Sequence, residues 1–374
     1  MKNLDSRKKD HPKNPSGSYF LKVLLFFGLY LFLAPNIIQG QSSEELVMKA
    51  YQLRINGKLY EGKSILDQVL LKDSTCALAW FELARTQQHL LLGGGKSSPA
   101  EILELITKAV KYDPDNAKYL FLQANSFYLK AYISDDSEEE PQKYIDKACK
   151  GFKDVFSLLP DNKEALLYLV DTYATLPENM GGNKEKANFY AQKLIELDKS
   201  NSAEAKAMLM PDSVDIVQYW NEIYNADPTA MAAEKLGIAY IYSEDITNAT
   251  KYLEEAMKLD PSKNLLQLDI ARVHVMMLMQ QKGDKNENMA LAKKSFQKFL
   301  DNNPNEINSY KAYTLGWIAK LENFSGNPEK SKELVAKAKE LDAYFSPAFG
   351  VPSKSLFFPP DKVSYYFSSY FRPF

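Results

Sequence analysis

Residues 93–98 read GGGKSS, and they are the most suggestive chemical motif in the chain. A glycine-rich turn followed by Lys96 and Ser97 suggests a phosphate-binding loop, which would make the protein a nucleotide hydrolase. That motif requires another glycine five residues before Gly95, where this chain has Leu90, and a β-strand leading in. The preceding residues CALAWFELARTQQHLLL have helical spacing instead. We therefore predict a turn between two helices, with Ser98 and Pro99 beginning the second one.

Further glycines occupy equivalent places. The segment LPENMGGNKEKA contains Gly181 and Gly182, and single glycines stand at Gly283 and Gly326. Glycine adopts the positive φ angles that helix C-caps need at no steric cost. We predict a turn between paired helices at each position.

No other group of residues predicts catalysis. The three histidines, His11, His89 and His274, have no partner at metal-ligand spacing, so His89 and His274 are expected to be packed or solvated helix residues. The acidic run 134–140, SDDSEEE, lacks the alternating ligands and the turn glycine of a calcium loop. We predict no catalytic residue, no metal and no cofactor, and hence no enzyme.

The two cysteines, Cys76 and Cys149, are expected on different pairs of helices that are not neighbours. Two free, buried thiols are the expectation, and a disulfide is the alternative.

A recurring helix ending organises the chain. It reads KLDP at Lys258–Pro261, KYDP at Lys111–Pro114 and NADP at Asn225–Pro228, with ELDK and ELDA as versions without proline. The endings are about 29 to 46 residues apart, which brackets the 34-residue period of a helix-turn-helix repeat. Asp or Asn closes each turn and proline cannot continue the helix, so each ending is a helix stop.

The unit Ala230–Pro261 resembles a tetratricopeptide repeat. The residues that carry the resemblance are Leu236, Gly237 and Tyr240 in the first helix, and Ala249, Ala256 and Pro261 in the second and its end. The resemblance implies an all-α fold, a right-handed α-solenoid of about eight antiparallel helix pairs covering residues 43–342. In the fifth unit, Pro211 is expected to cut the first helix short.

Such arrays bind a partner segment in a concave groove lined by the first helices. Carried onto this chain, the resemblance implies a groove formed by Phe81, Arg85, Gln88, Leu120, Phe127, Leu167, Asp171, Glu234, Ile238, Tyr310, Tyr313, Trp317 and Lys320. The Lys and Asn with which chaperone-binding members clamp an acidic terminus are absent, so that function is not carried over. An apolar, aromatic groove suits an amphipathic helix or an extended apolar segment.

The first 40 residues are typical of an export signal. Six cations precede or flank the apolar run VLLFFGLYLFLA at Val23–Ala34, and 12 residues are fewer than the roughly 20 that span a bilayer. Cleavage near Gly40 and retention as an anchor are both compatible with the sequence. Either way, we expect an exported chain that is periplasmic, held in the cell envelope or secreted. Without this leader the formal net charge falls from −2 to near −6, which excludes nucleic acid as a partner.

Residues 343–374 hold eleven aromatic residues and several prolines without helical period. Two interpretations are open: a cap over the last helix pair or the groove, and a docking segment for a partner or a membrane surface. The sequence thus predicts a non-catalytic protein-interaction scaffold of the cell envelope. The alternative is an accessory, ligand-presenting component of a periplasmic solute-uptake or envelope-assembly system.

Overall fold

The computed structural model describes residues 41–92, 96–133, 141–211 and 213–344, all of them helices and short connections. The chain divides into two units, residues 1–45 and 46–374, and the helical array belongs to the second apart from the first turn of its first helix. The leader, the run 134–140 and the tail 345–374 lie outside the described residues. None of the described helices has the length and hydropathy needed to cross a membrane.

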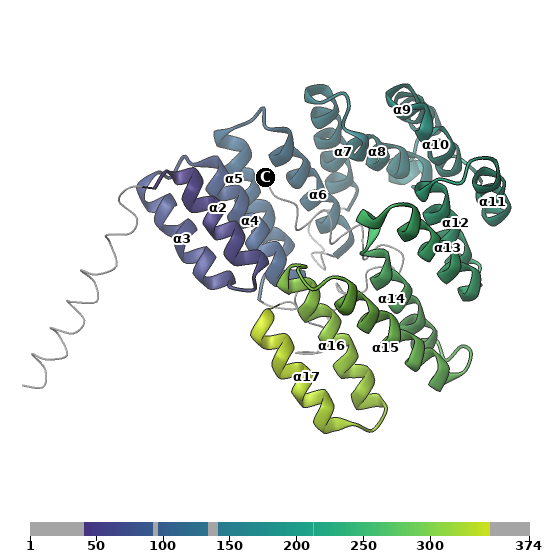
Figure 1. The fold of residues 1–374 in the computed structure, drawn as a ribbon. Coiled ribbons are helices and arrows are strands. Elements are labelled where there is room, and N and C mark those ends of the chain that lie inside the picture. Colours follow the sequence, from purple (N-terminus) through teal and green to yellow (C-terminus); the bar gives the residue numbers. More distant parts are fainter. Residues whose placement is uncertain (1–40, 93–95, 134–140, 212, 345–374) are drawn as a thin grey trace, which may run out of the picture. The chain divides into compact units, whose positions relative to one another are not determined.

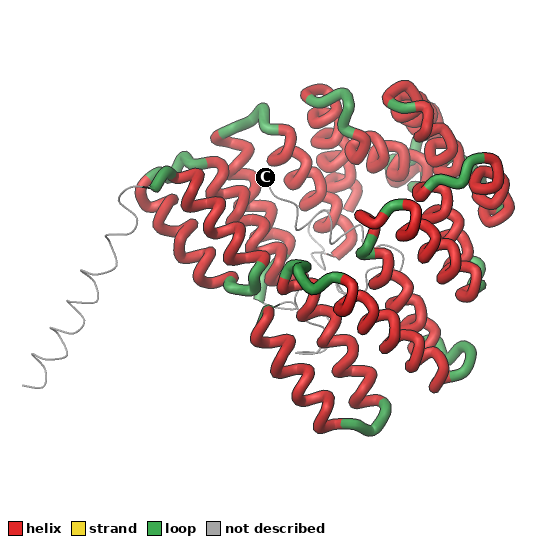
Figure 2. Tube along the Cα trace, viewed as in Figure 1, coloured by secondary structure: helices red, strands yellow, loops and turns green. Residues whose placement is uncertain are grey.

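Figures 1 and 2 show the helices arranged as consecutive hairpins. The pairs are α2 (Ser43–Ile55) with α3 (Leu59–Lys72), α4 (Ala77–Leu92) with α5 (Pro99–Tyr112), α6 (Ala117–Ile133) with α7 (Pro141–Leu158), α8 (Lys163–Thr175) with α9 (Lys184–Leu197), α10 (Ser202–Met208) with α11 (Ile216–Ala226), α12 (Ala230–Tyr242) with α13 (Ile246–Leu259), α14 (Leu266–Met279) with α15 (Lys285–Asn302), and α16 (Asn308–Phe324) with α17 (Pro328–Leu341). Three-residue 3-10 turns, η2 (Glu178–Met180), η3 (Lys199–Asn201) and η4 (Pro261–Lys263), connect some of them. The prediction of an all-α array of helix pairs is confirmed. The short α10 agrees with the expectation that Pro211 shortens the fifth unit.

Small residues let the two helices of a pair approach closely. A Cβ added to Gly237 in α12 would lie 2.8 Å from Cγ of Leu253 in α13. Ala249 and Ala256, on the facing side of α13, are almost completely buried. Any larger side chain at these positions would force the helices apart, which explains why the unit uses glycine and alanine there.

The predicted turn glycines adopt the expected conformations. Gly181, Gly283 and Gly326 have φ values of +95°, +68° and +82°, each between the two helices of a pair. At Gly182 an added Cβ would lie 1.7 Å from the carbonyl oxygen of Leu176, so only glycine fits. These glycines therefore form turns, as predicted.

The helix after GGGKSS also begins as predicted. The hydroxyl oxygen of Ser98 accepts a hydrogen bond from the backbone N–H of Glu101 at 3.2 Å, and Pro99 occupies the first turn of α5. This is an ordinary helix N-cap. Residues 93–95 themselves lie outside the described part.

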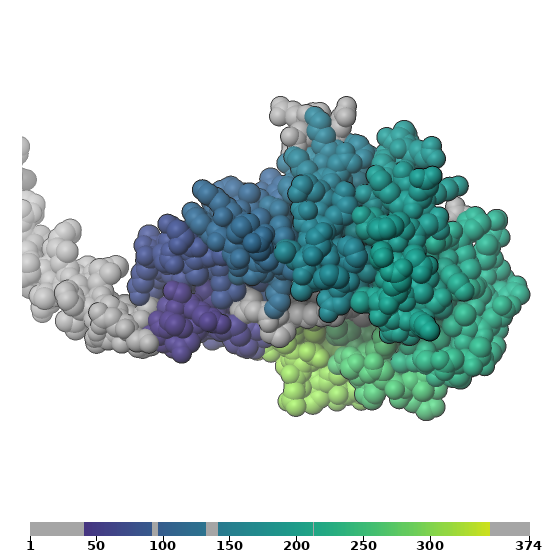
Figure 3. Space-filling view, turned by 90° about the horizontal axis from the view of Figure 1, so that it is seen from above, coloured from purple at the N-terminus to yellow at the C-terminus, as the bar shows by residue number. Residues whose placement is uncertain are grey.

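Aromatic side chains fill space both between successive pairs and within a pair. Phe152 of α7 is fully buried and stacks on Tyr168 of α8, with ring centroids 4.5 Å apart. Tyr173 of α8 stacks on Tyr190 of α9 at 5.9 Å. The space-filling view shows α7 to α13, in blue-green to green, in continuous contact (Figure 3). Among the described residues the buried side chains form several clusters, and single clusters extend across consecutive pairs, as a stacked repeat requires.

The first and last pairs of the array are in contact, which the sequence did not predict. Tyr51 and Ile55 of α2 share a hydrophobic cluster with Tyr310 of α16. At the turn after α2, a Cβ on Gly57 would lie 2.1 Å from the carbonyl oxygen of Leu341, at the end of α17. The two ends therefore cover part of each other's apolar surface.

A buried polar contact joins the second pair to the last. Nε2 of His89, in α4, lies 2.9 Å from Oδ2 of Asp342, which follows α17. The same oxygen accepts a hydrogen bond from the Ser309 hydroxyl of α16 at 2.7 Å, and Oδ1 accepts one from the N–H of Tyr344 at 2.9 Å. Burial raises the pKa of Asp342, but the charge of His89 and these hydrogen bonds outweigh it, so the pKa is lowered overall.

Candidate partner-binding surface

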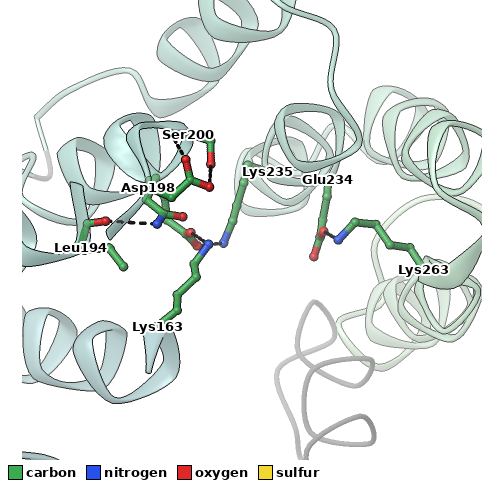
Figure 4. Close-up of polar contacts among 9 residues, drawn as sticks. Lys163, Leu194, Asp198, Ser200, Glu234, Lys235 and Lys263 are labelled. Atoms are coloured by element: carbon green, nitrogen blue, oxygen red, sulfur yellow. Dashed lines mark hydrogen bonds and ion pairs between the residues drawn. The ribbon is translucent and has the colours of Figure 1, made fainter. Parts of the chain in front are cut away.

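Ion pairs connect successive middle units (Figure 4). Lys163 of α8 and Lys235 of α12 contact the two carboxylate oxygens of Glu204 in α10, at 2.9 and 2.6 Å. Glu234 of α12 pairs with Lys263 of η4 at 2.6 Å. Burial raises the pKa of Glu204, but Lys235 and Lys163 lower it by more, so the carboxylate is ionised. Opposite charges therefore alternate across four successive units.

The start of the shortened unit is fixed by local hydrogen bonds. Asp198 accepts hydrogen bonds from the N–H and the hydroxyl of Ser200, at 2.9 and 2.6 Å. The amide of Asn201 donates to the carbonyl oxygen of Leu194 at 3.1 Å (Figure 4). These contacts place α10 so that Glu204 reaches both lysines.

A buried charged cluster lies between α2 and α4. Nε of Arg54 is 2.6 Å from Oε1 of Glu82, and Nη1 of Arg85 is 3.5 Å from Oε2 of the same residue. The Arg85 guanidinium also lies over the rings of Tyr51 and Phe81, at 5.5 and 5.4 Å. Burial and repulsion by Arg54 lower the pKa of Arg85 to about 10, so it remains a cation at neutral pH.

A second cationic cluster lies where α14 and α16 meet. The Arg272 guanidinium is 4.5 Å from the ring centroid of Trp317, and Nζ of Lys320 is 5.0 Å from it. Phe296 of α15 stacks on the same indole at 6.4 Å. Burial, followed by the charge of Arg272, lowers the pKa of Lys320. The aromatic ring therefore holds two cations close together.

The predicted groove residues fall into two classes. Those with buried side chains are Phe81, Arg85, Gln88, Leu120, Tyr310 and Tyr313, and those with half-buried side chains are Phe127, Leu167, Asp171, Glu234, Ile238, Trp317 and Lys320. Five of the six buried ones come from the second and eighth units, near the contact between the two ends. The half-buried ones lie mainly on the middle units. The groove assignment remains a prediction for both classes.

Sequence reasoning missed Arg54, Glu82 and Arg272. Each is a charged residue buried on the first helix of its pair, with an exposed fraction of 5% or less. In α14 the run LQLDIARVHVMM places polar residues in a helix that is buried nearly all round. Charged residues within a strongly apolar helix are unusual in globular proteins, and this pattern could have indicated the buried charges.

His89 and His274 are both buried. Nδ1 of His274 lies 3.1 Å from the amide oxygen of Asn288, and burial lowers its pKa. No group of three or more metal-binding side chains occurs among the residues that the structure describes. Cys76 and Cys149 are free thiols, the first half-buried and the second buried.

The packing of the pairs agrees with the resemblance found in the sequence. Each unit that carries an alanine or glycine where two helices meet buries it, as Ala109, Ala148, Ala187, Ala292 and Ala338 show, all at 0 to 1% exposure. The array is of the tetratricopeptide-repeat type. No family model matches the chain, and no curated protein matches it in sequence.

Solved tetratricopeptide structures resemble the array. A thermophilic tetratricopeptide protein in Thermus thermophilus is 17% identical with a TM-score of 0.40, covering 63% of this chain and 100% of its own. A tetratricopeptide protein from Parabacteroides merdae is also 17% identical with a TM-score of 0.41, covering 80% of this chain and 99% of its own. YrrB, described as having an unusual peptide-binding site, is 14% identical with a TM-score of 0.25, covering 64% of this chain and 94% of its own.

Proposed function

We propose that the chain is a non-catalytic scaffold that binds a segment of a protein partner on the surface formed by the first helices of its tetratricopeptide units. The observation that carries the proposal is the different burial of two sets of side chains within each pair. Small residues such as Ala187 and Ala249 are buried in the packing between helices. Apolar side chains of the first helices, such as Leu167 and Ile238, remain half-buried on the middle units, at the edges of their core clusters.

This surface has the composition of a peptide-binding site. It combines aromatic and aliphatic side chains with charges held in place by ion pairs, such as Glu234 with Lys263. Residues that are already fixed lose little conformational entropy when a partner binds. A segment with apolar anchors and polar flanks fits such a surface.

The proposed setting is outside the cytoplasmic membrane. The cationic stretch and 12-residue apolar run of the leader support export, and the near −6 charge of the remainder disfavours nucleic acid. Within that setting the scaffold would contact the membrane only through the leader or the aromatic tail.

Site-specific photocrosslinking in the source cells tests the proposal. A photoreactive amino acid replaces Leu167 or Ile238 in the full chain, and the matched control position is Phe189, which is 53% exposed on the second helix α9. We expect both groove positions to crosslink the same protein and Phe189 to crosslink none. Equal crosslinking at all three positions, or none at the groove, would refute the proposal. A thermal shift produced by a small solute in the absence of any crosslink would favour the ligand-presenting alternative.

A further inference from the structure

Arg272 has hydrogen-bonding capacity that the described protein does not use. Its side chain is only 5% exposed, yet Nε and Nη1 have no hydrogen-bond partner in the described residues. A guanidinium is always charged and carries donors but no acceptor. A buried donor without a partner is costly, and more so when it is charged. An arginine in this state indicates a site for an acceptor supplied from outside.

The side chains that share the Trp317 ring with Arg272 are also donors. Nζ of Lys320 lies 5.0 Å from the centroid of the same ring, whereas the indole N–H of Trp317 interacts with the Tyr313 hydroxyl. Burial and the charge of Arg272 act together to lower the pKa of Lys320. Asp269 stands one turn before Arg272 on α14, and Nε and Nη1 of Arg272 are left without a hydrogen bond even so. Two cations therefore lie on one indole ring, and Nε and Nη1 of Arg272 have no hydrogen-bond acceptor among the described residues.

We propose that Arg272, Lys320 and Trp317 form an anion subsite that binds a carboxylate side chain of the partner segment, with an apolar residue of that segment packing on the indole. This inference rests on the proposed function, because it specifies the chemistry of the segment that the first-helix surface takes. A planar guanidinium matches a carboxylate with two parallel hydrogen bonds. Binding a carboxylate would satisfy the donors of Arg272 and relieve the repulsion between the two cations.

The half-buried indole of Trp317 favours a peptide over a small free anion. Phe296 and Tyr313 are buried and pack against this ring, at 6.4 Å between centroids, so the partly exposed indole is the aromatic surface that a ligand can contact. Such a surface contributes binding energy only to a ligand with an apolar part next to its charge. The inferred motif is an Asp or Glu adjacent to a large apolar residue.

A selection from a random peptide library displayed on phage tests this motif without knowledge of the partner. The full chain is the bait, and selections with Arg272→Gln and Lys320→Gln run in parallel. The matched control is Lys294→Gln, which changes an exposed lysine on α15 that makes no ion pair, hydrogen bond or ring contact with Arg272, Lys320 or Trp317 in the part of the chain that the structure describes. We expect wild type and the Lys294 variant to enrich peptides with an acidic residue beside an apolar one, and the two test variants to lose the acidic preference.

A synthetic peptide from the selection then gives the magnitude. Replacing its acidic residue by Gln or Asn should weaken binding to wild type by about tenfold or more, and should change binding to Arg272→Gln little. Trp317 fluorescence reports the binding in a chain carrying Trp80→Phe and Trp220→Phe. Arg272→Lys should bind with intermediate affinity, which separates a lost charge from a misfolded chain.

The outcomes distinguish the two proposals. Enriched peptides without an acidic preference would overturn the anion subsite and leave the scaffold function standing. Acidic peptides that bind Arg272→Gln and Lys320→Gln as tightly as wild type would overturn the subsite as well. Failure to enrich any peptide would count against the proposed function itself.

Discussion

Replacing Asp342 by alanine should loosen both ends of the array together. The Asp342 side chain is fully buried and contacts Ser309 and His89, which lie on different units. Removing one partner of a buried charged pair costs about 3 to 5 kcal/mol, because the donors left behind are buried without acceptors. We expect a loss of this size in the free energy that holds the last pair against the first two.

Hydrogen exchange measured by mass spectrometry resolves this effect by segment. A loss of about 3 to 5 kcal/mol should speed exchange in α2, α4, α16 and α17 by a hundredfold or more wherever opening limits exchange. The middle helices α8 to α13 should change little, because stability in a repeat array is a sum of neighbouring contributions. The matched control is Asp260→Ala. Asp260 also accepts hydrogen bonds in a turn after a helix, but its donor is Ser262, only two residues along the chain, and these hydrogen bonds are exposed.

The pH dependence gives an independent check on the same residue. The pKa of Asp342 in the folded chain lies below its ordinary value of 3.8, so its contribution is complete above that value. The contribution is lost as the pH falls through the lowered pKa. Wild type and Asp342→Ala should therefore differ most above about pH 4 and converge at lower pH. Faster exchange in α17 alone, with α2 and α4 unchanged, would show that Asp342 is only a local cap and would refute the reasoning.

Three further predictions concern single positions. Gly182→Ala should lower the melting temperature, because its Cβ would collide with the carbonyl oxygen of Leu176; normal melting would rule out the close approach. Arg54→Leu should cost about 3 to 5 kcal/mol in denaturant unfolding by leaving Glu82 buried without its closest partner, and Arg54→Leu combined with Glu82→Leu should recover part of that loss. The thiol of Cys149 should react with a disulfide reagent at about pH 8 far more slowly than the other cysteine, because burial raises its pKa; equal rates would contradict its burial.

The local structure could be predicted from the sequence because its causes are local. A helix stop at Lys258–Pro261 and a turn at Gly181 depend on residues a few positions away, so each leaves a readable pattern. The small residues at Gly237 and Ala249 likewise stand at fixed positions of the repeat. These features were enough to predict the helix pairs and the type of repeat.

The contacts between distant units could not be predicted in the same way. His89 and Asp342 are 253 positions apart, and nothing in either neighbourhood indicates the other. The curvature that brings their units together is the sum of many small rotations between pairs, none of which a motif specifies. For the same reason no pattern around Phe81 or Tyr313, both assigned to the groove, indicates that their side chains are buried.

The contact between the first and last pairs constrains how this array can evolve. A tetratricopeptide array with free ends can gain or lose a unit by duplication, because only one neighbour on each side must be accommodated. Here an inserted unit would separate Gly57 from the end of α17, where their backbones touch. We therefore expect variants of this chain to diverge by substitution within units while keeping the number of repeats.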